Sequence, residues 1–142
     1  MTIVKSYEDV DDKLLKFAVI ITKSNGKWVF CKHKNRETLE VPGGHREEGE
    51  DILETARREL YEETGAIEYN IFPICVYSVT APWNFNGVET FGKLFYADVR
   101  SFEQELHSEI EKIVITDSLP SNWTYPEIQP KLMEFAKEKG YV

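Results

Sequence analysis

The sequence is poor in cysteine and contains no long apolar run, and each shortage excludes a class of protein. Its two cysteines, Cys31 and Cys75, stand alone in apolar stretches. We therefore interpret them as buried thiols of a reducing compartment rather than as a disulfide pair. No apolar run approaches the roughly 18 residues of a membrane-spanning helix, and the first residues lack the pattern of a signal peptide. These absences favour a cytoplasmic protein without a membrane partner.

Basic side chains are also in short supply. Seventeen lysines and arginines stand against 25 aspartates and glutamates, which gives a net charge of −8. A protein that holds nucleic acid by its phosphates needs a basic surface, and this composition does not provide one. We therefore expect a small phosphate ligand, bridged to acidic residues by divalent cations, rather than a stable nucleic-acid complex.

Length and periodicity predict one α/β domain that spans residues 1–142. With 42% hydrophobic residues the chain can bury a full core. The turn signals Ser24-Asn25-Gly26 and Asn86-Gly87 predict hairpins, and Pro73 predicts an edge or a bulge. Strands before and after a helix, with another helix at the end, predict a mixed sheet covered on both faces. The expected strands are 16–22, 27–33, 70–81, 88–99 and 112–116, and the expected helices are 51–64 and 125–139.

The segment 44–66, GHREEGEDILETARRELYEETGA, is the most informative stretch of the chain. Residues 51–64 contain no glycine or proline, and apolar or small residues recur at helical intervals, so we predict an amphipathic helix that ends at the following glycine. At about 100° per residue, Glu59, Glu62 and Glu63 fall on one edge of this helix, beside its apolar stripe. Three carboxylates therefore share one edge of a helix that packs on the core.

Like charges at this spacing repel one another, and a divalent cation would turn the repulsion into attraction. Several oxygen ligands with water in the remaining positions suit Mg²⁺, or Mn²⁺ in its place, and the sequence shows no Cys/His cluster that would compete for a softer metal. The alternative is a solvated, glutamate-rich helix face, which is the usual meaning of a charge run. Seven fixed positions at this spacing favour the metal site.

The pattern Gly44-x5-Glu50-x7-Arg58-Glu59-Leu60-x-Glu62-Glu63-x-Gly65 resembles the signature of the Nudix hydrolases. Val41-Pro42-Gly43 before it is similar to the usual lead-in of that family. Ala66 departs from the pattern, because the family usually has a bulkier aliphatic residue there. The resemblance implies an α/β protein with the Nudix α/β/α sandwich, in which a mixed β-sheet lies between the box helix and a C-terminal helix.

The resemblance also implies metal-assisted attack of water on a phosphoanhydride bond, for which no Ser/His/Asp set is required. It assigns Glu59 and Glu63 as ligands of Mg²⁺, Glu62 as a further ligand or water contact, and the Gly43 carbonyl as another candidate ligand. Arg58 is expected to orient the box glutamates.

The general base stays open among Glu62, Glu63 and Glu109. Glu109 precedes the expected strand 112–116, where similar proteins place a carboxylate on a loop; its alternative is an ordinary exposed glutamate. Glu50 is expected to anchor the loop, paired with the box arginine. The histidines lie far apart in the sequence, so surface or packing roles are expected for His33, His45 and His107.

Substrate contacts are predicted at two kinds of position. Lys32 and Arg36 lie on either side of the end of the strand 27–33, where they could meet phosphate oxygens unless solvent surrounds them. Trp83 and Trp123 stand in aromatic segments that could stack on a base, although core packing is the commoner use of such rings.

The residues from 119 to the final helix are similar to Nudix proteins that act on nucleoside triphosphates, including oxidised guanine nucleotides. We therefore expect hydrolysis of a nucleoside triphosphate to the monophosphate and pyrophosphate. The same segment is similar to bacterial relatives that remove pyrophosphate from RNA 5′ ends, which is the first alternative. A non-catalytic Nudix-fold module that binds a nucleotide is the second. Such a module would be expected to have lost part of its metal set, and Glu59, Glu62 and Glu63 are all intact here.

Overall fold

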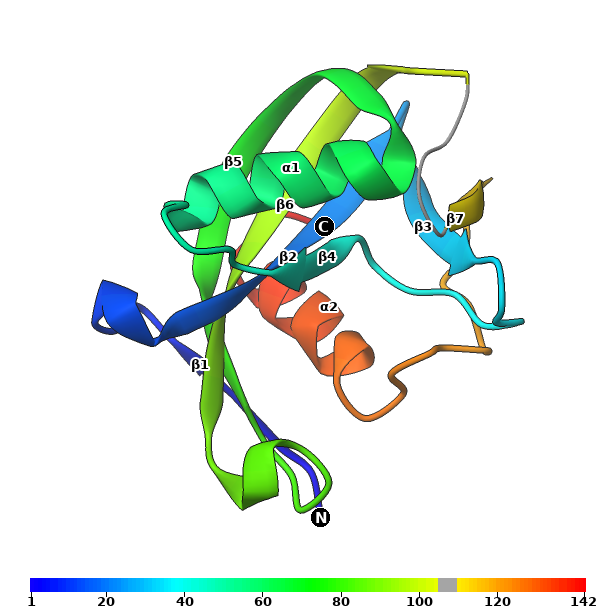
Figure 1. Ribbon diagram of the computed structural model, residues 1–142. Coiled ribbons are helices and arrows are strands. Elements are labelled where there is room, and N and C mark those ends of the chain that lie inside the picture. The colour runs from blue at the N-terminus through cyan, green and yellow to red at the C-terminus, as the bar shows by residue number, and fades with distance from the viewer. Residues whose placement is uncertain (105–109) are drawn as a thin grey trace.

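Seven strands form one mixed β-sheet in the computed structural model, which describes residues 1–104 and 110–142 (Figure 1). The strands are β1 (Ile3–Tyr7), β2 (Leu15–Ser24), β3 (Lys27–His33), β4 (Gly43–His45), β5 (Ala66–Thr80), β6 (Thr90–Phe102) and β7 (Ile110–Thr116). Their order in the described part of the chain is β1-β5-β6-β2-β3-β7, and the short β4 pairs with β2 outside this path. β2 and β6 run parallel and the other pairs run antiparallel, so the predicted mixed sheet is confirmed.

Helix α1 (Ile52–Thr64) begins and ends where its local sequence dictates. Asp51 caps it in a capping box: the Glu54 amide donates to Asp51 Oδ1 over 2.9 Å, and the Asp51 amide donates to Glu54 Oε1 over 3.2 Å. Gly65 ends the helix with a φ of 76°, a left-handed conformation that glycine adopts without steric cost. The predicted helix 51–64 is therefore confirmed to within one residue.

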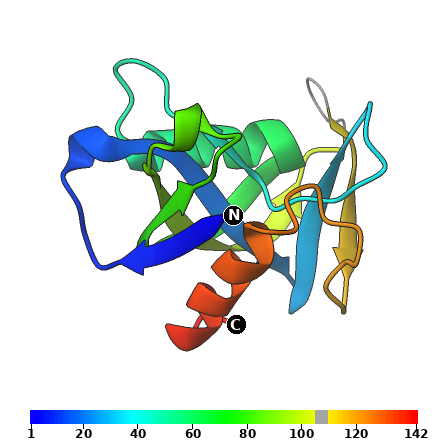
Figure 2. The ribbon, with the colours of Figure 1, turned by 90° about the horizontal axis from the view of Figure 1, so that it is seen from below.

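The two helices cover opposite faces of the sheet (Figure 2). From α1, Ile52, Ala56 and Leu60 pack against a core cluster that includes Ile20 of β2. From α2 (Gln129–Glu138), three residues pack into a second cluster that includes Ile21 of β2: Leu132, Met133 and Ala136. Because neighbouring residues of a strand point to opposite faces, β2 is buried on both sides and separates two cores. The expected α/β/α sandwich is confirmed.

Both predicted hairpins are present. β2 and β3 are joined through Asn25 and Gly26, which have φ values of 52° and 78°, as the central residues of a type I′ turn require. β5 and β6 pair along most of their length, and their connection contains a short 3₁₀ helix, η2 (Phe85–Gly87). The register of this pair shifts between Pro73 and Cys75, so the bulge that Pro73 predicts is confirmed.

The sequence missed two strands and placed other boundaries differently. β1 has no regular alternation of buried and exposed residues, and β4 is three residues long with two glycines, so neither carries a strand signal. β5 starts directly after Gly65, four residues before its predicted start. α2 begins at Gln129 rather than at 125, with Pro130 in its first turn, where proline costs no hydrogen bond.

A second 3₁₀ helix, η1 (Asp12–Leu14), precedes β2 and lies near the loop that leads into α1. No helix in residues 1–104 or 110–142 combines the length and the apolar character needed to cross a membrane.

Candidate active site

Arg58 of α1, whose side chain is partly buried, organises the loop that precedes the helix. Its Nε donates to Glu50 Oε2 over 2.6 Å and its Nη2 donates to Glu50 Oε1 over 3.0 Å, so the expected pairing is confirmed. The same Nη2 donates to the His45 carbonyl over 2.9 Å. These hydrogen bonds from Arg58 are the main reason why the pKa of Glu50 falls to about 2. The loop carboxylate is therefore ionised and fixed in place.

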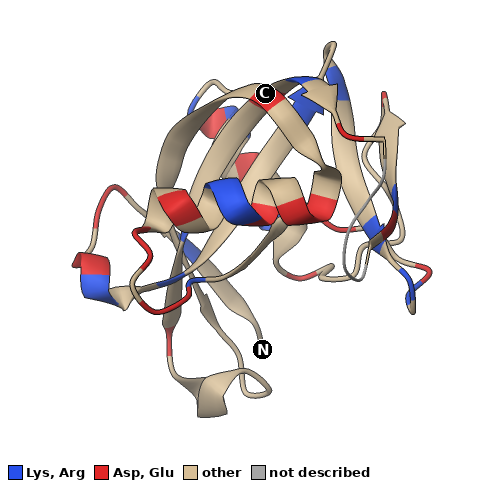
Figure 3. Cartoon of the chain, turned by 45° about the horizontal axis from the view of Figure 1, so that its top comes forward, with Lys and Arg blue, Asp and Glu red and all other residues tan. Residues whose placement is uncertain are grey.

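The other donor of Arg58 meets the glutamate edge of α1, which is defined by Glu59, Glu62 and Glu63. Nη1 donates to Glu62 Oε1 over 2.7 Å and to Glu59 Oε2 over 3.2 Å. In Figure 3 the ribbon of α1 carries several red stretches of acidic residues, with a blue stretch of arginines among them. The guanidinium group of Arg58 thus binds Glu50 in the loop and two carboxylates of the glutamate edge.

Glu63 is the most deeply placed residue of this edge. Its Oε1 accepts a hydrogen bond of 2.8 Å from the Gly43 amide, and its side chain is 12% exposed. Burial raises the pKa of Glu63 to about 8, and the charges of Glu59, Glu40 and Glu62 add to the rise. Burial likewise raises the pKa of Glu59. Without a cation, the protein therefore disfavours full ionisation of this edge.

Two glycines let β4 lie directly against the glutamate edge. Gly43 and Gly44 pair with Val19 and Ala18 of β2. A Cβ atom on Gly44 would collide with the carboxylate of Glu59, so a larger residue there would displace that side chain. The lead-in glycines are therefore explained by close packing of backbone and carboxylate, a reason that the sequence pattern alone does not give.

The donor set at this edge fits a hard divalent cation. Glu59, Glu62 and Glu63 offer carboxylate oxygens, the ligand type that Mg²⁺ and Mn²⁺ prefer. Burial raises the pKa values of Glu59 and Glu63, and a bound cation would favour their ionised forms. The Gly43 amide is taken by Glu63, whereas its carbonyl stays a predicted ligand.

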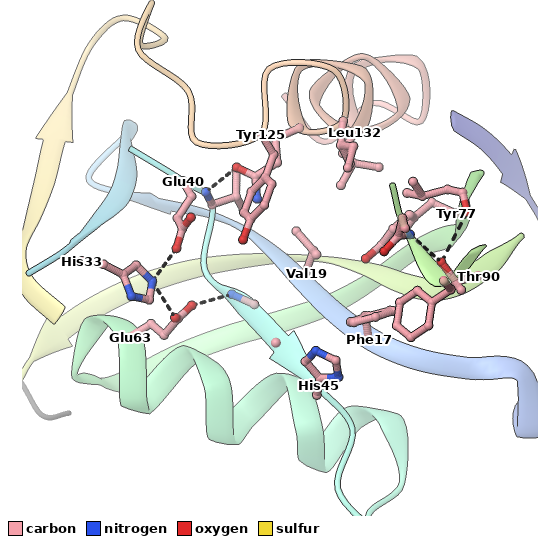
Figure 4. A pocket seen from close by; sticks show the side chains of 18 of the residues that line it. Phe17, Val19, His33, Glu40, His45, Glu63, Tyr77, Thr90, Tyr125 and Leu132 are labelled. Carbon is pink, nitrogen blue, oxygen red and sulfur yellow. Dashed lines mark hydrogen bonds and ion pairs between the residues drawn. The ribbon is translucent and has the colours of Figure 1, made fainter. Parts of the chain in front are cut away.

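A cavity of about 530 Å³ opens beside the glutamate edge, and this volume is typical of small-molecule sites (Figure 4). Glu63 and Gly43 line its acidic end. Its other walls are mostly apolar and come from β2, β5, the connection around η2, and the start of α2 with the loop before it. These walls include Phe17, Val19, Tyr77, Val79, Trp83, Phe85, Thr90, Tyr125, Ile128 and Leu132.

The structure brings two of the four predicted substrate residues to this cavity. Trp83 and Arg36 line it, and Trp83 is 61% exposed. Lys32 does not, because strand alternation turns its buried side chain to the other face of β3, where Nζ lies 3.2 Å from Glu111 Oε1. Trp123 packs edge-on against Phe30 at 5.5 Å, partly buried against the core cluster beneath α2. Glu109 and His107 lie outside the described residues.

His33 corrects the expectation of a surface or packing role. Its Nε2 contacts Glu40 and lies 3.3 Å from Glu63 Oε2, and the residue lines the cavity. His45 also lines the cavity, but its ring packs against Phe17 at 4.6 Å, as a packing role predicts.

The fold also brings one cysteine and one histidine together with two glutamates, a grouping that the sequence did not predict. The ligand atoms of Cys31, His33, Glu40 and Glu63 all lie within 4.8 Å of one another. The available signal was the spacing of Cys31 and His33, since residues two apart on a strand share one face. The two glutamates join them only through the tertiary fold.

Comparisons with known proteins agree with this architecture. The family model of the NUDIX domain matches residues 12–133. The "Putative 8-oxo-dGTP diphosphatase YtkD" of Bacillus subtilis (strain 168) is 30% identical over 108 residues, which cover 75% of this chain. The match spans 65% of that relative, just under two thirds of its length.

Solved structures show the same fold. The Bacillus subtilis pyrophosphohydrolase BsRppH superposes with a TM-score of 0.79 at 24% identity, covering 98% of this chain and 92% of that one. The NUDIX domain of Shewanella oneidensis NrtR, solved with ADP ribose, has a TM-score of 0.66 at 17% identity and covers 92% and 94% of the two chains. The family match extends over most of the sequence and includes the glutamate edge, so this chain belongs to the Nudix hydrolase family.

Proposed function

We propose that this protein is a Mg²⁺-dependent pyrophosphohydrolase that converts a nucleoside triphosphate, oxidised purine nucleotides included, to the monophosphate and pyrophosphate. The observation that carries the proposal is the position of Glu63, the innermost residue of the glutamate edge, at one end of a cavity of about 530 Å³ with aromatic walls. A nucleotide has the matching polarity, because its phosphates are charged and its base is flat and mostly apolar. The similarity to YtkD, whose name describes an 8-oxo-dGTP diphosphatase, supports the oxidised purine.

Glu59, Glu62 and Glu63 are the proposed ligands of Mg²⁺, or of Mn²⁺ in its place, with the Gly43 carbonyl as a further candidate. When bound, the cation offsets phosphate charge and lowers the pKa of a coordinated water. Arg58 acts as a positioning residue, because its hydrogen bonds to Glu59 and Glu62 fix the direction of two carboxylates. The proposed general base is Glu62 or Glu63, with Glu109 as the candidate outside the described residues.

The apolar end of the cavity is the proposed base site. Trp83 and Phe85 lie on the connection between β5 and β6, and both are more than half exposed, so their ring faces are accessible to a ligand. Stacking on such rings contributes about 1–3 kcal/mol per base. Arg36, on the same cavity, is the proposed contact for phosphate oxygens.

The test is a screen for Mg²⁺-dependent release of pyrophosphate and phosphate. Its substrates are nucleoside triphosphates including 8-oxo-dGTP, nucleotide sugars, ADP-ribose, dinucleoside polyphosphates and 5′-triphosphorylated RNA. We expect pyrophosphate and a monophosphate from a nucleoside triphosphate. Glu62→Gln and Glu63→Gln should each lower turnover by at least about 10²-fold with the fold intact. Glu48→Gln, in the exposed loop before α1, is the control and should keep the wild-type rate.

The result that overturns the assignment is wild-type turnover in both glutamine variants. The salt dependence of substrate affinity distinguishes RNA 5′-pyrophosphate removal from nucleotide hydrolysis. Contacts to several RNA phosphates produce a steep loss of affinity with salt, and contacts to a single nucleotide do not. A non-catalytic module would bind a nucleotide with no product release at any Mg²⁺ concentration.

A further inference from the structure

A second group of possible metal ligands lies next to the glutamate edge, on the far side of Glu63. It consists of Cys31 and His33 on β3, Glu40 on the segment that follows, and Glu63 on α1; we call it the thiol–imidazole cluster. Four ligand atoms, one from each residue, lie within 4.8 Å of one another. In Figure 4, His33, Glu40 and Glu63 point toward one another from three segments of the chain. The Nudix signature accounts for Glu63 alone among these residues.

Backbone hydrogen bonds hold the cluster in shape before any ligand arrives. The Cys31 amide donates to the Glu40 carbonyl over 2.9 Å, and the Glu40 amide donates to the Cys31 carbonyl over 3.1 Å. The Gly43 amide holds Glu63 from the other side over 2.8 Å. Cys31 is fully buried and Glu40 nearly so, which means that little water competes for their ligand atoms. The backbone around Cys31 and Glu40 is therefore held in place and the thiol is shielded from water, whereas His33 and Glu63 face the cavity.

The ligand types differ from those of the glutamate edge. A thiolate and an imidazole select Zn²⁺ and similar transition-metal cations over Mg²⁺. Tetrahedral Zn²⁺ with its usual bond lengths sets one sulfur and three nitrogen or oxygen ligands about 3.3–3.6 Å apart. The widest pairs of the cluster would therefore approach by no more than about 1.5 Å, whereas His33 Nε2 and Glu40, which are closer than this, would move apart. Burial and the charges of Glu63 and Glu40 raise the pKa of the Cys31 thiol, and a divalent cation would reverse that electrostatic environment.

We propose that Cys31, His33, Glu40 and Glu63 form a tetrahedral site for a transition-metal cation of the Zn²⁺ class. On binding, the Cys31 S–H bond breaks and a metal–sulfur bond forms, and a protonated Glu63 also loses its proton; both protons leave to solvent. Neutral His33, with its proton on Nδ1, donates the lone pair of Nε2. No electron is transferred. Because Glu63 belongs to both sites, occupation of this one withdraws a ligand from Mg²⁺ and lowers pyrophosphate release, a consequence that rests on the proposed function.

Co²⁺ is the spectroscopic probe of the site. Titrated into the metal-free wild-type chain, one equivalent should give the intense visible bands of tetrahedral Co²⁺ and a near-ultraviolet thiolate-to-cobalt absorption, and Zn²⁺ should displace it. Cys31→Ser should lose the thiolate absorption. Cys75→Ser is the matched control, because Cys75 is also a buried thiol but lies in the cluster beneath α2, and it should keep both signals. His33→Gln should weaken Co²⁺ binding by about 10-fold or more.

Circular dichroism establishes which variants are folded. If Cys31→Ser does not fold, the loss of Co²⁺ affinity in His33→Gln tests the site instead. The proposal is wrong if wild-type protein binds Co²⁺ without the thiolate absorption, or if Cys75→Ser rather than Cys31→Ser removes it. Zn²⁺ added in excess Mg²⁺ should inhibit the wild type more strongly than Cys31→Ser, each compared with its own rate. A wild-type cobalt spectrum with no Mg²⁺-dependent pyrophosphate release would leave this site standing and reject the proposed function.

Discussion

Arg58 donates to both carboxylate oxygens of Glu50, through Nε over 2.6 Å and through Nη2 over 3.0 Å, and its remaining donor reaches Glu62 over 2.7 Å. One planar cation thus joins the loop before α1 to the glutamate edge. The fork geometry matters, because a guanidinium group can bind a carboxylate at two points while holding a third partner. The hydrogen bonds from Arg58 also keep the pKa of Glu50 near 2, so the contact persists at neutral pH.

Arg58→Lys keeps the charge and removes the fork, so it tests the positioning role. A lysine ammonium cannot hold Glu50 at two points and still fix Glu62, and we expect Mg²⁺-dependent turnover to fall by about 10- to 100-fold. Arg57→Lys is the matched control, because its neighbouring guanidinium faces Tyr69 instead of the edge. Steady-state kinetics of both variants test this prediction. Equal turnover in the two variants would show that Arg58 does not position the catalytic glutamates.

Glu63 makes the stability of the metal-free protein depend on pH. Its pKa is about 8 when folded against an ordinary value of 4.5, so the folded state binds one more proton between these values. The stabilisation is complete below about pH 4.5 and is lost as the pH rises through about 8, at up to about 1.4 kcal/mol per pH unit. Denaturant unfolding across this window should show the decline in wild type and a shallower slope in Glu63→Gln.

Saturating Mg²⁺ should flatten the wild-type slope, because a bound cation stabilises the ionised carboxylate. Mg²⁺ affinity should rise over the same window, as fewer protons must be released on binding. Glu59 titrates in the same direction, which is why the difference between wild type and Glu63→Gln is the relevant quantity. Parallel slopes in the two proteins would contradict the buried, proton-holding state of Glu63.

Trp83 and Trp123 should respond oppositely to truncation. Trp83 is exposed on the cavity wall, so Trp83→Ala should raise KM for the nucleotide by about 5- to 100-fold, the value of one stacking contact, with little change in stability. Trp123 is partly buried against the core and packs on Phe30, so Trp123→Ala should lower the free energy of unfolding by on the order of 2 kcal/mol and leave KM nearly unchanged. Kinetics and denaturant unfolding on both variants test the pair, and a KM effect confined to Trp123→Ala would reverse the assignment.

The sequence predicted those parts of the fold whose signals are local. The terminating Gly65 and the Asn25-Gly26 turn each act within a few residues, and the structure places both as expected. β4 has no such signal. Its two glycines form a strand because β2 supplies a partner and because α1 leaves no room for a Cβ beside Glu59.

The candidate site divides in the same way. The glutamate edge follows from helical spacing, whereas the meeting of His33 with Glu40 and Glu63 depends on three segments packing together. Lys32 shows the limit of reasoning from position, since it stands beside His33 in the sequence but projects from the opposite face of β3 toward Glu111. Two residues close together on a strand share a site only if they point to the same face, and neighbouring residues point to opposite faces.

Gly44→Ala tests whether backbone packing positions the glutamate edge. The added Cβ would collide with the Glu59 carboxylate, so that side chain must move from its place beside Arg58. Displacement of a reacting group by about 1 Å costs on the order of 10²-fold in rate, and we expect a loss of that size in Mg²⁺-dependent turnover. Overpacking should also lower the free energy of unfolding by about 1–3 kcal/mol.

A double-mutant cycle on stability identifies the cause of that loss. Glu59→Ala removes the atoms with which the new Cβ collides, so Gly44→Ala should cost much less stability in that background than in the wild type. If the cost is the same in both backgrounds, the strain lies in the β4 backbone and its pairing with Ala18, and Gly44 is required by the sheet instead of by the carboxylate. A small cost in the Glu59→Ala background would mean that this glycine is selected to make room for Glu59, which ties the first residue of the signature physically to its glutamate edge.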